Sequence, residues 1–252
     1  MQKLINKILK SRKIKILQLN KDIYEYMLYF CDDATIFSAI SANEKIYENR
    51  EEIYERIVKK KYPGSEKWKK ERKSWESHFI RVANFVAILK RRYGIPYFEG
   101  LNPKKFYLTV RDRTDRDVQI LATHEAIRAK NLKMVKLFVS RIGDMKNVCS
   151  GCIGLAIRVD SLEIVKYFLE NFSDDGQINY LADEAISLNR IDIFHYLLEK
   201  GANNFNLFLL EASYASNLPL VKLAINKGAT SIHSALEHVT DPEIEKYLRI
   251  FI

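Results

Sequence analysis

Two stretches of the sequence carry side chains whose type and spacing suit chemistry. The first is CSGC, in which Cys149 and Cys152 have the spacing of zinc ligands or of a redox pair. A structural zinc site needs two further ligands, and no second CxxC or nearby histidine pair supplies them. The pair is therefore interpreted as structural, and the sequence predicts neither a metal site nor a cofactor.

The second stretch is the basic run KKKYPGSEKWKKERK at residues 59–73. A solvated helix face, a nuclear localisation signal and a nucleic-acid contact all fit such a run. In the last case lysines and arginines would meet phosphates, and Tyr62 and Trp68 would stack on bases. Glu66, Glu71 and Glu76 interrupt the positive charge and argue against a phosphate track, so nucleic-acid binding is kept as an alternative.

Known catalytic signatures are missing from the sequence. It has no glycine-rich phosphate loop, no HExxH and no GxSxG, and glycine is scarce at nine residues. We therefore expect a protein without catalytic activity of its own.

Composition and charge divide the 252 residues into two parts. Residues 1–100 hold 22 Lys and Arg against 13 Asp and Glu, whereas residues 101–252 hold 19 of each. No apolar run is long enough to cross a membrane, and the N-terminus lacks the features of a signal peptide. Three cysteines without an export signal favour a reducing compartment, so we expect an intracellular protein.

The neutral part repeats a unit anchored on an alanine. The separations of the anchors are 30, 29 and 27 residues, followed by a fifth, atypical unit. The anchors are Ala126, Ala156, Ala185, Ala212 and Ala235. Apolar residues eight, nine, twelve and thirteen positions past each of the first four anchors predict a buried helical stripe, and a Lys or His ten positions past points away from it. The fifth unit has one extra residue before its stripe. Each unit is thus a short helix, a polar turn and a second helix, and only stacked units can bury their apolar faces.

This pattern resembles the ankyrin repeat. Gly201-Ala202 and Gly228-Ala229 fall at the family's spacing, and His124-Glu125-Ala126 resembles its H-x-A element. The period is shorter than the family's 33 residues, so we expect trimmed loops. Asp241-Pro242 predicts the start of the last helix. The resemblance implies an all-α helix-turn-helix solenoid of four to five degenerate repeats that binds a target protein.

Residues 15–62 predict a three-helix module that ends at Pro63-Gly64. Its apolar positions, with Asp32-Asp33 before the second helix, resemble the F-box, and the segment from Ile53 to SWESHFIR resembles the tail that follows it. The resemblance implies docking on a Skp-type adaptor of a cullin ubiquitin ligase. The residues expected to bind the adaptor are Leu19, Ile23, Met27, Phe30, Ile36 and Phe37.

The predicted organisation is a basic segment (1–14), the F-box-like module (15–62), a basic helical connector (63–110) and ankyrin-like repeats (111–252). A chain that joins these modules is similar to proteins of large DNA viruses, which implies action in the cytoplasm or nucleus of a host cell. Two alternatives are a plain ankyrin scaffold and a basic nucleic-acid-associated protein. The target is expected to contact Arg128, Arg158, Ser187 and Tyr214.

Overall fold

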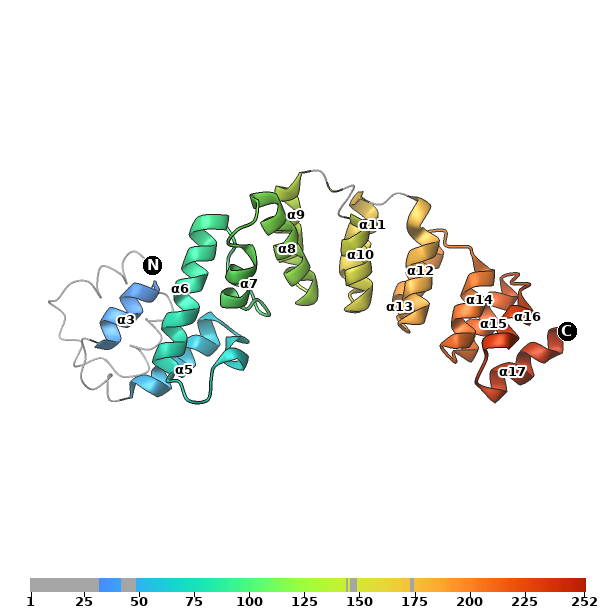
Figure 1. Cartoon of the computed structure of the whole chain (residues 1–252), viewed down its shortest axis with the longest axis horizontal. Coiled ribbons are helices and arrows are strands. Elements are labelled where there is room, and N and C mark those ends of the chain that lie inside the picture. The colour runs from blue at the N-terminus through green and yellow to red at the C-terminus, as the bar shows by residue number, and fades with distance from the viewer. Residues whose placement is uncertain (1–31, 42–48, 144, 146–148, 173–174) are drawn as a thin grey trace. The chain divides into compact units, whose positions relative to one another are not determined.

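The computed structural model describes residues 32–41, 49–143, 145, 149–172 and 175–252 (Figure 1). Within these ranges every regular element is a helix, which confirms the predicted all-α class. The chain divides into two compact units, Met1–Val118 and Gln119–Ile252, and each is described by itself.

The first unit is built from short helices around one long one. Its described elements are α3 (Asp33–Ser41), α5 (Arg50–Lys61), the 3-10 turn η2 (Ser65–Trp68), α6 (Trp75–Tyr93), α7 (Pro103–Val110) and the start of α8 (Asp115–Arg128). Helix α5 packs against α6, and α6 packs against α7.

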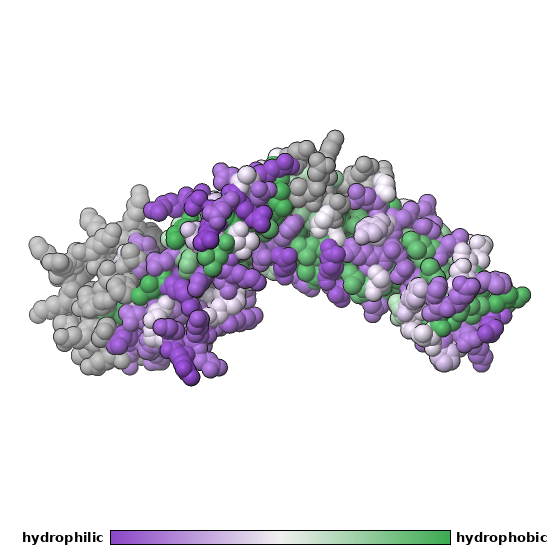
Figure 2. Space-filling view, in the orientation of Figure 1, coloured by the Kyte–Doolittle hydropathy of each residue, from purple (hydrophilic) through white to green (hydrophobic). Residues whose placement is uncertain are grey.

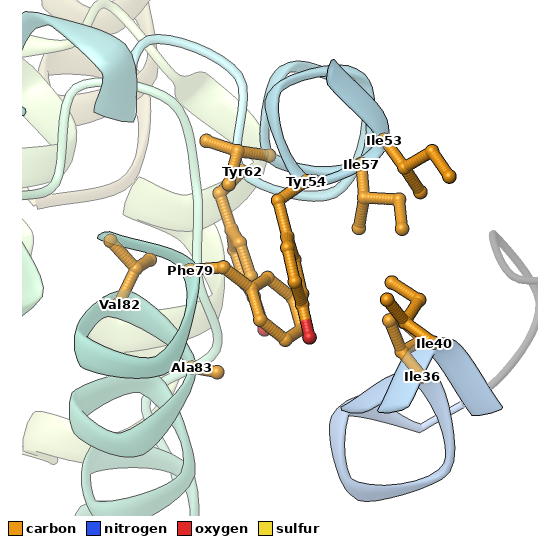
Figure 3. Close-up of a cluster of buried hydrophobic side chains, with 10 residues drawn as sticks. Ile36, Ile40, Ile53, Tyr54, Ile57, Tyr62, Phe79, Val82 and Ala83 are labelled. Carbon is orange, nitrogen blue, oxygen red and sulfur yellow. The ribbon is translucent and has the colours of Figure 1, made fainter. Parts of the chain in front are cut away.

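One apolar core joins α3, α5 and α6. Ile36 and Ile40 of α3 face Ile53 and Ile57 of α5, and all four side chains are fully buried or nearly so (Figure 3). Phe79 of α6 completes the cluster, with its ring centroid 5.2 Å from that of Tyr54. The predicted module and the predicted connector therefore contribute to the same core.

Polar contacts fix the ends of these helices. The Asp32 carboxylate accepts a hydrogen bond of 2.8 Å from the Thr35 amide, so Asp32 caps α3 as its position in the sequence suggests. Asp33 forms a 2.7 Å ion pair with Lys61 and accepts a hydrogen bond from the Tyr62 hydroxyl. These contacts tie α3 to the end of α5, which stops just before Pro63, with Gly64 left-handed at φ 83°.

The second unit is a succession of helix pairs. After α8 come α9 (Leu132–Ile142), α10 (Cys149–Arg158), α11 (Leu162–Phe172), η3 (Asp175–Gln177), α12 (Ile178–Ser187), α13 (Ile191–Glu199), α14 (Phe205–Tyr214), α15 (Leu218–Asn226), α16 (Ile232–His238), α17 (Pro242–Leu248) and η4 (Arg249–Phe251). Each of α10, α12, α14 and α16 packs against its sequence successor, and α10, α12 and α14 each also pack against the next first helix along the chain.

The turn inside each of the first four pairs has the same backbone geometry. Four non-glycine residues with φ between 51° and 57° follow the anchoring alanines at a constant distance of four positions: Lys130, Asp160, Asn189 and Ser216. The next amide in each turn donates to the carbonyl of the anchoring alanine, as in Asn131 to Ala126 at 2.9 Å. This is the Schellman arrangement of a helix end, made four times without glycine.

Burial follows the predicted stripes. All five anchoring alanines are fully buried, because a larger side chain there would hold neighbouring helices apart. The largest side chains of the second unit's core are Phe138, Phe168, Phe194 and Phe208. Gly201 and Gly228 follow α13 and α15 in the left-handed region, at φ 104° and 99°, as predicted for helix ends.

Asparagines close the loops between successive pairs. The Asn179 side-chain oxygen accepts hydrogen bonds from the amides of Asn203 and Asn204, at 2.8 and 3.1 Å. Asn206 makes the same contacts one pair later, to Thr230 and Ser231, at 2.7 and 3.1 Å. Both asparagines lie six positions before the anchoring alanine of their unit. The same pair of side-chain hydrogen bonds therefore orders two loops that contain no β-hairpin.

Candidate interaction surface

The four residues predicted to contact a target occupy one equivalent position in successive helix pairs. Each is the last residue of its helix, and each is exposed. They are Arg128 on α8, Arg158 on α10, Ser187 on α12 and Tyr214 on α14. The common turn explains this placement, because it ends every first helix two residues past its buried alanine.

We call this set, with the half-buried residues three or four positions earlier on the same helices, the first-helix surface. These half-buried residues are His124, Glu125, Leu155, Asp183, Glu184, Leu210 and Glu211. Arg128 pairs with Glu125 of its own helix at 2.7 Å, whereas Arg158 pairs with Glu184 of the next first helix at 3.0 Å. The Tyr214 ring stacks on His238, with centroids 4.8 Å apart. The same backbone position thus presents a cation, a hydroxyl or an aromatic ring.

Two carboxylates with raised pKa values lie on the α12–α14 part of this surface. Burial raises the pKa of the Asp183 carboxyl, and its Oδ1 accepts no hydrogen bond from any residue that the structure describes. Burial raises the pKa of Glu211 as well, and the negative charge of Asp183 adds to that shift. Burial, with help from Arg128, lowers the pKa of His124 at the other end. The surface therefore changes from cationic to acidic and aromatic along the chain.

The second helices carry a different pattern, a ladder of lysines over tyrosines. The Lys136 ammonium lies 5.3 Å from the centroid of Tyr167, and Lys166 lies 5.1 Å from that of Tyr196. A shallow groove of about 540 Å³ runs along this face beside Lys136 and Lys166. Each lysine belongs to one helix pair and contacts a tyrosine ring of the next, so these cation–π contacts help to hold neighbouring pairs together.

Sequence reasoning missed this ladder and took the lysines for a solvated helix face. The sequence does contain a signal for the ladder. Tyr167 and Tyr196 each lie eleven positions past the anchoring alanine of their own unit, and the lysines each lie ten positions past theirs. It also missed the asparagine contacts of the loops, for which a single unit gives no clue.

The predicted adaptor-binding residues are placed only in part. Leu19, Ile23, Met27 and Phe30 lie outside the described residues, as does the side chain of Phe37. Ile36 is fully buried in the core of α3, α5 and α6. Its apolar character is therefore explained by packing within the unit.

The described part of the chain offers neither a metal site nor a membrane-spanning helix. No group of three or more His, Cys, Asp or Glu side chains there is arranged to hold a metal ion. Cys152 is buried on α10, and the Cys149 side chain is outside the described residues. None of the described helices combines the length and apolarity needed to span a membrane.

The apolar surface of the second unit gathers at its last helices. Ile250, Phe251 and Ile252 remain 72 %, 47 % and 62 % exposed, and Figure 2 shows hydrophobic surface beside α17.

A comparison of the chain with protein-family models, with curated proteins and with solved structures found no match in any of the three.

Proposed function

We propose that this protein is a non-catalytic interaction module whose ankyrin-like repeats hold a target protein on the first-helix surface. The observation that carries the proposal is the contrast between backbone and side chains. The backbone turn is the same at Lys130, Asp160, Asn189 and Ser216, while the exposed residue two positions earlier is Arg in the first two pairs, Ser in the third and Tyr in the fourth. A repeated frame with variable exposed residues is how stacked repeats present a partner-specific surface.

The N-terminal unit acts, in this proposal, as an F-box-type docking module for a Skp-type adaptor of a cullin ubiquitin ligase. The chain would then raise the concentration of its target near the ligase without performing chemistry. Support comes from the sequence resemblance of residues 15–62, and from the start of α3 after Asp32 and the end of α5 before Pro63, which agree with the helix boundaries predicted from the sequence. Because Ile36 is buried, the residues left to bind the adaptor in this proposal are Leu19, Ile23, Met27, Phe30 and Phe37.

A plain ankyrin scaffold without a ligase is the second candidate. The shared core of Ile36, Tyr54 and Phe79 favours it, because helices that pack mainly on one another suit a cap at the end of a repeat array. A nuclear or cytoplasmic location in a host cell fits either candidate and follows from the resemblance alone.

The test is capture of a Skp-type adaptor with its cullin from a eukaryotic lysate by the purified full chain. The proposal expects both partners to be retained, and expects loss of both in Leu19→Asp/Ile23→Asp. Gln2→Asp/Asn6→Asp adds the same charge to the preceding basic segment, outside the predicted module, and should retain them. Circular dichroism must show that each variant keeps its helix content.

A folded full chain that captures neither adaptor nor cullin would leave the scaffold candidate.

Target binding by the first-helix surface has a separate test in the same capture experiment. Arg158→Glu and Tyr214→Ala should each lose proteins that the wild-type chain retains from the lysate. Lys133→Glu on the second helix α9 is the matched control for Arg158→Glu, as Lys133 is exposed on the other helix of a pair.

A further inference from the structure

A glutamate recurs on the first-helix surface, immediately before the anchoring alanine of three helix pairs. It is Glu125 on α8, Glu184 on α12 and Glu211 on α14, and each is half-buried. A half-buried carboxylate has lost part of its hydration, so a cation beside it lowers its free energy. Because the three glutamates hold the same place in the repeated unit, their surroundings can be compared directly.

Arginine neutralises two of the three glutamates. A guanidinium nitrogen of Arg128, three positions later on the same helix, lies 2.7 Å from a carboxylate oxygen of Glu125. A guanidinium nitrogen of Arg158, at the end of the preceding first helix, lies 3.0 Å from Glu184. The surface therefore has two positions from which an arginine reaches this glutamate.

Glu211 has an arginine at neither position. The residue three positions later on α14 is Tyr214, and the residue at the end of α12 is Ser187. Burial raises the pKa of Glu211, and the charge that adds to this shift is the negative one of Asp183. Among the residues that the structure describes, no cation therefore replaces the arginine of the other two pairs.

Asp183 adds a second carboxylate that needs a donor. Its Oδ1 is buried and accepts no hydrogen bond from the described residues. Helices α12 and α14 pack against each other, and Asp183 lies close enough to raise the pKa of Glu211. Both carboxylates can therefore be reached by one cationic group.

Tyr214 offers an aromatic ring beside this pair of carboxylates. The side chain is 53 % exposed and stacks on His238. Tyr214 and Glu211 lie three positions apart on α14 and thus on the same side of the helix. A guanidinium can donate to carboxylates through its edge and lie flat on an aromatic ring, which a lysine ammonium does less well.

We propose that the first-helix surface binds an arginine side chain of the target protein between Asp183 and Glu211, beside the ring of Tyr214. This inference rests on the proposed function and gives the chemistry of its partner. The guanidinium would take the place that Arg128 and Arg158 fill in the other pairs, and would give Asp183 Oδ1 a donor. Its five N–H groups allow it to donate to both carboxylates at once.

The probe is a capped Gly-Arg-Gly peptide, titrated into the full chain and followed by NMR of the Asp183 and Glu211 carboxyl carbons. The control peptide has citrulline in place of arginine, which keeps the shape and removes the charge. We expect saturable binding of the arginine peptide within about 10 mM, which nearly fills a site with a Kd of about 1 mM. The citrulline peptide should not bind.

Removal of the two carboxylates tests the location of the site. Asp183→Asn/Glu211→Gln should weaken binding of the arginine peptide about tenfold or more. Asp192→Asn/Glu199→Gln removes the same charge from exposed positions of the second helix α13, and should change the affinity less than twofold.

Ser187→Arg tests the comparison between the helix pairs. It places an arginine before Glu211 as Arg158 is placed before Glu184, so it should occupy Glu211 and weaken peptide binding about fivefold. Ser187→Gln adds a long polar side chain without charge, and should change the affinity less than twofold. If the double carboxylate variant loses its fold by circular dichroism, these two variants at an exposed position decide the question.

Several results would overturn the proposal. They are absence of saturable arginine-peptide binding, equal binding of the citrulline peptide, equal weakening by both charge-removing double variants, and equal affinity of Ser187→Arg and wild type. Failure of this inference can be told apart from failure of the proposed function. If Arg158→Glu and Tyr214→Ala lose captured proteins but the peptide does not bind, the proposed function stands and the arginine site is wrong. If the peptide binds but the full chain captures no protein, the arginine site stands and the target-binding role is wrong.

Discussion

The ammonium nitrogen of Lys166 lies 5.1 Å from the centroid of the Tyr196 ring, across the boundary between two helix pairs. The pairing recurs in Lys136 over Tyr167 and in Lys222 over Tyr247, both at 5.3 Å. It is interrupted where the equivalent positions hold His195 and Leu223. The second helices are therefore joined by charge against aromatic faces as well as by apolar packing.

Loss of one rung should weaken the second unit. Lys166→Gln is expected to lower the free energy of unfolding by about 0.5–1 kcal/mol, because it removes the cation but keeps an unbranched polar side chain. Urea denaturation of the full chain measures the change. Lys133→Gln is the matched control, and an equal loss in both variants would mean that the ring contact contributes nothing.

The asparagine contacts of the loops should matter more. Asn206→Ala leaves the amides of Thr230 and Ser231 without their acceptor, and is expected to cost about 1–3 kcal/mol. Asn206→Asp keeps an acceptor oxygen in place and should retain most of the stability. Denaturation midpoints of the two variants test this ranking, and an alanine variant as stable as the aspartate variant would contradict it.

The left-handed turn residues predict a stabilising change. Ser216 has φ 51°, which costs a non-glycine residue about 1 kcal/mol. Ser216→Gly removes that cost but loosens the unfolded chain, so a net gain of about 0.5 kcal/mol is expected from thermal melting. Ala215→Gly, one residue earlier at φ −74°, should instead destabilise. Melting shifts of the same sign in both variants would refute the argument.

Stability should depend on pH through Asp183. Burial raises its pKa in the folded state, so the folded state binds the proton more tightly than the unfolded chain does. The resulting stabilisation is complete below the unfolded pKa of about 3.9 and is lost as the pH rises through the folded value. Asp183→Asn should therefore be more stable than wild type at pH 7.

That advantage should shrink as the pH falls through the raised pKa of Asp183, because the wild-type carboxyl then becomes neutral as well. Denaturation midpoints of both proteins between pH 3 and pH 8 measure it, with Asp192→Asn on the exposed face of α13 as the control for charge removal. A variant less stable than wild type at pH 7, or a constant advantage at all pH values, would argue against a desolvated charge.

The sequence predicted the helices and their buried stripes because these depend on local periodicity. Ala126 and Ala212 were recognised as anchors of the repeated unit and are buried, and Asp241 marked the start of the last helix, where its carboxylate accepts a 2.8 Å hydrogen bond from the Glu243 amide. Each of these features follows from residue type and spacing within one or two turns.

Features that depend on contact between distant segments could not be predicted. A small pocket of the first unit brings together Lys70, Arg81 and Lys104, and only the path of the chain through η2 and α7 places them side by side. Ile36 shows the same difficulty, because an apolar residue at helical spacing serves a core and a docking face equally well until its burial is known.

The central claim is tested most directly by calorimetric titration of a purified Skp-type adaptor into the full chain. We predict saturable one-to-one binding that is lost in Leu19→Asp/Ile23→Asp and kept in Gln2→Asp/Asn6→Asp. No heat of binding from a wild-type chain shown to be folded by circular dichroism, at adaptor concentrations up to about 100 μM (a Kd that corresponds to a binding free energy of about −5.5 kcal/mol), would contradict the ligase-receptor account.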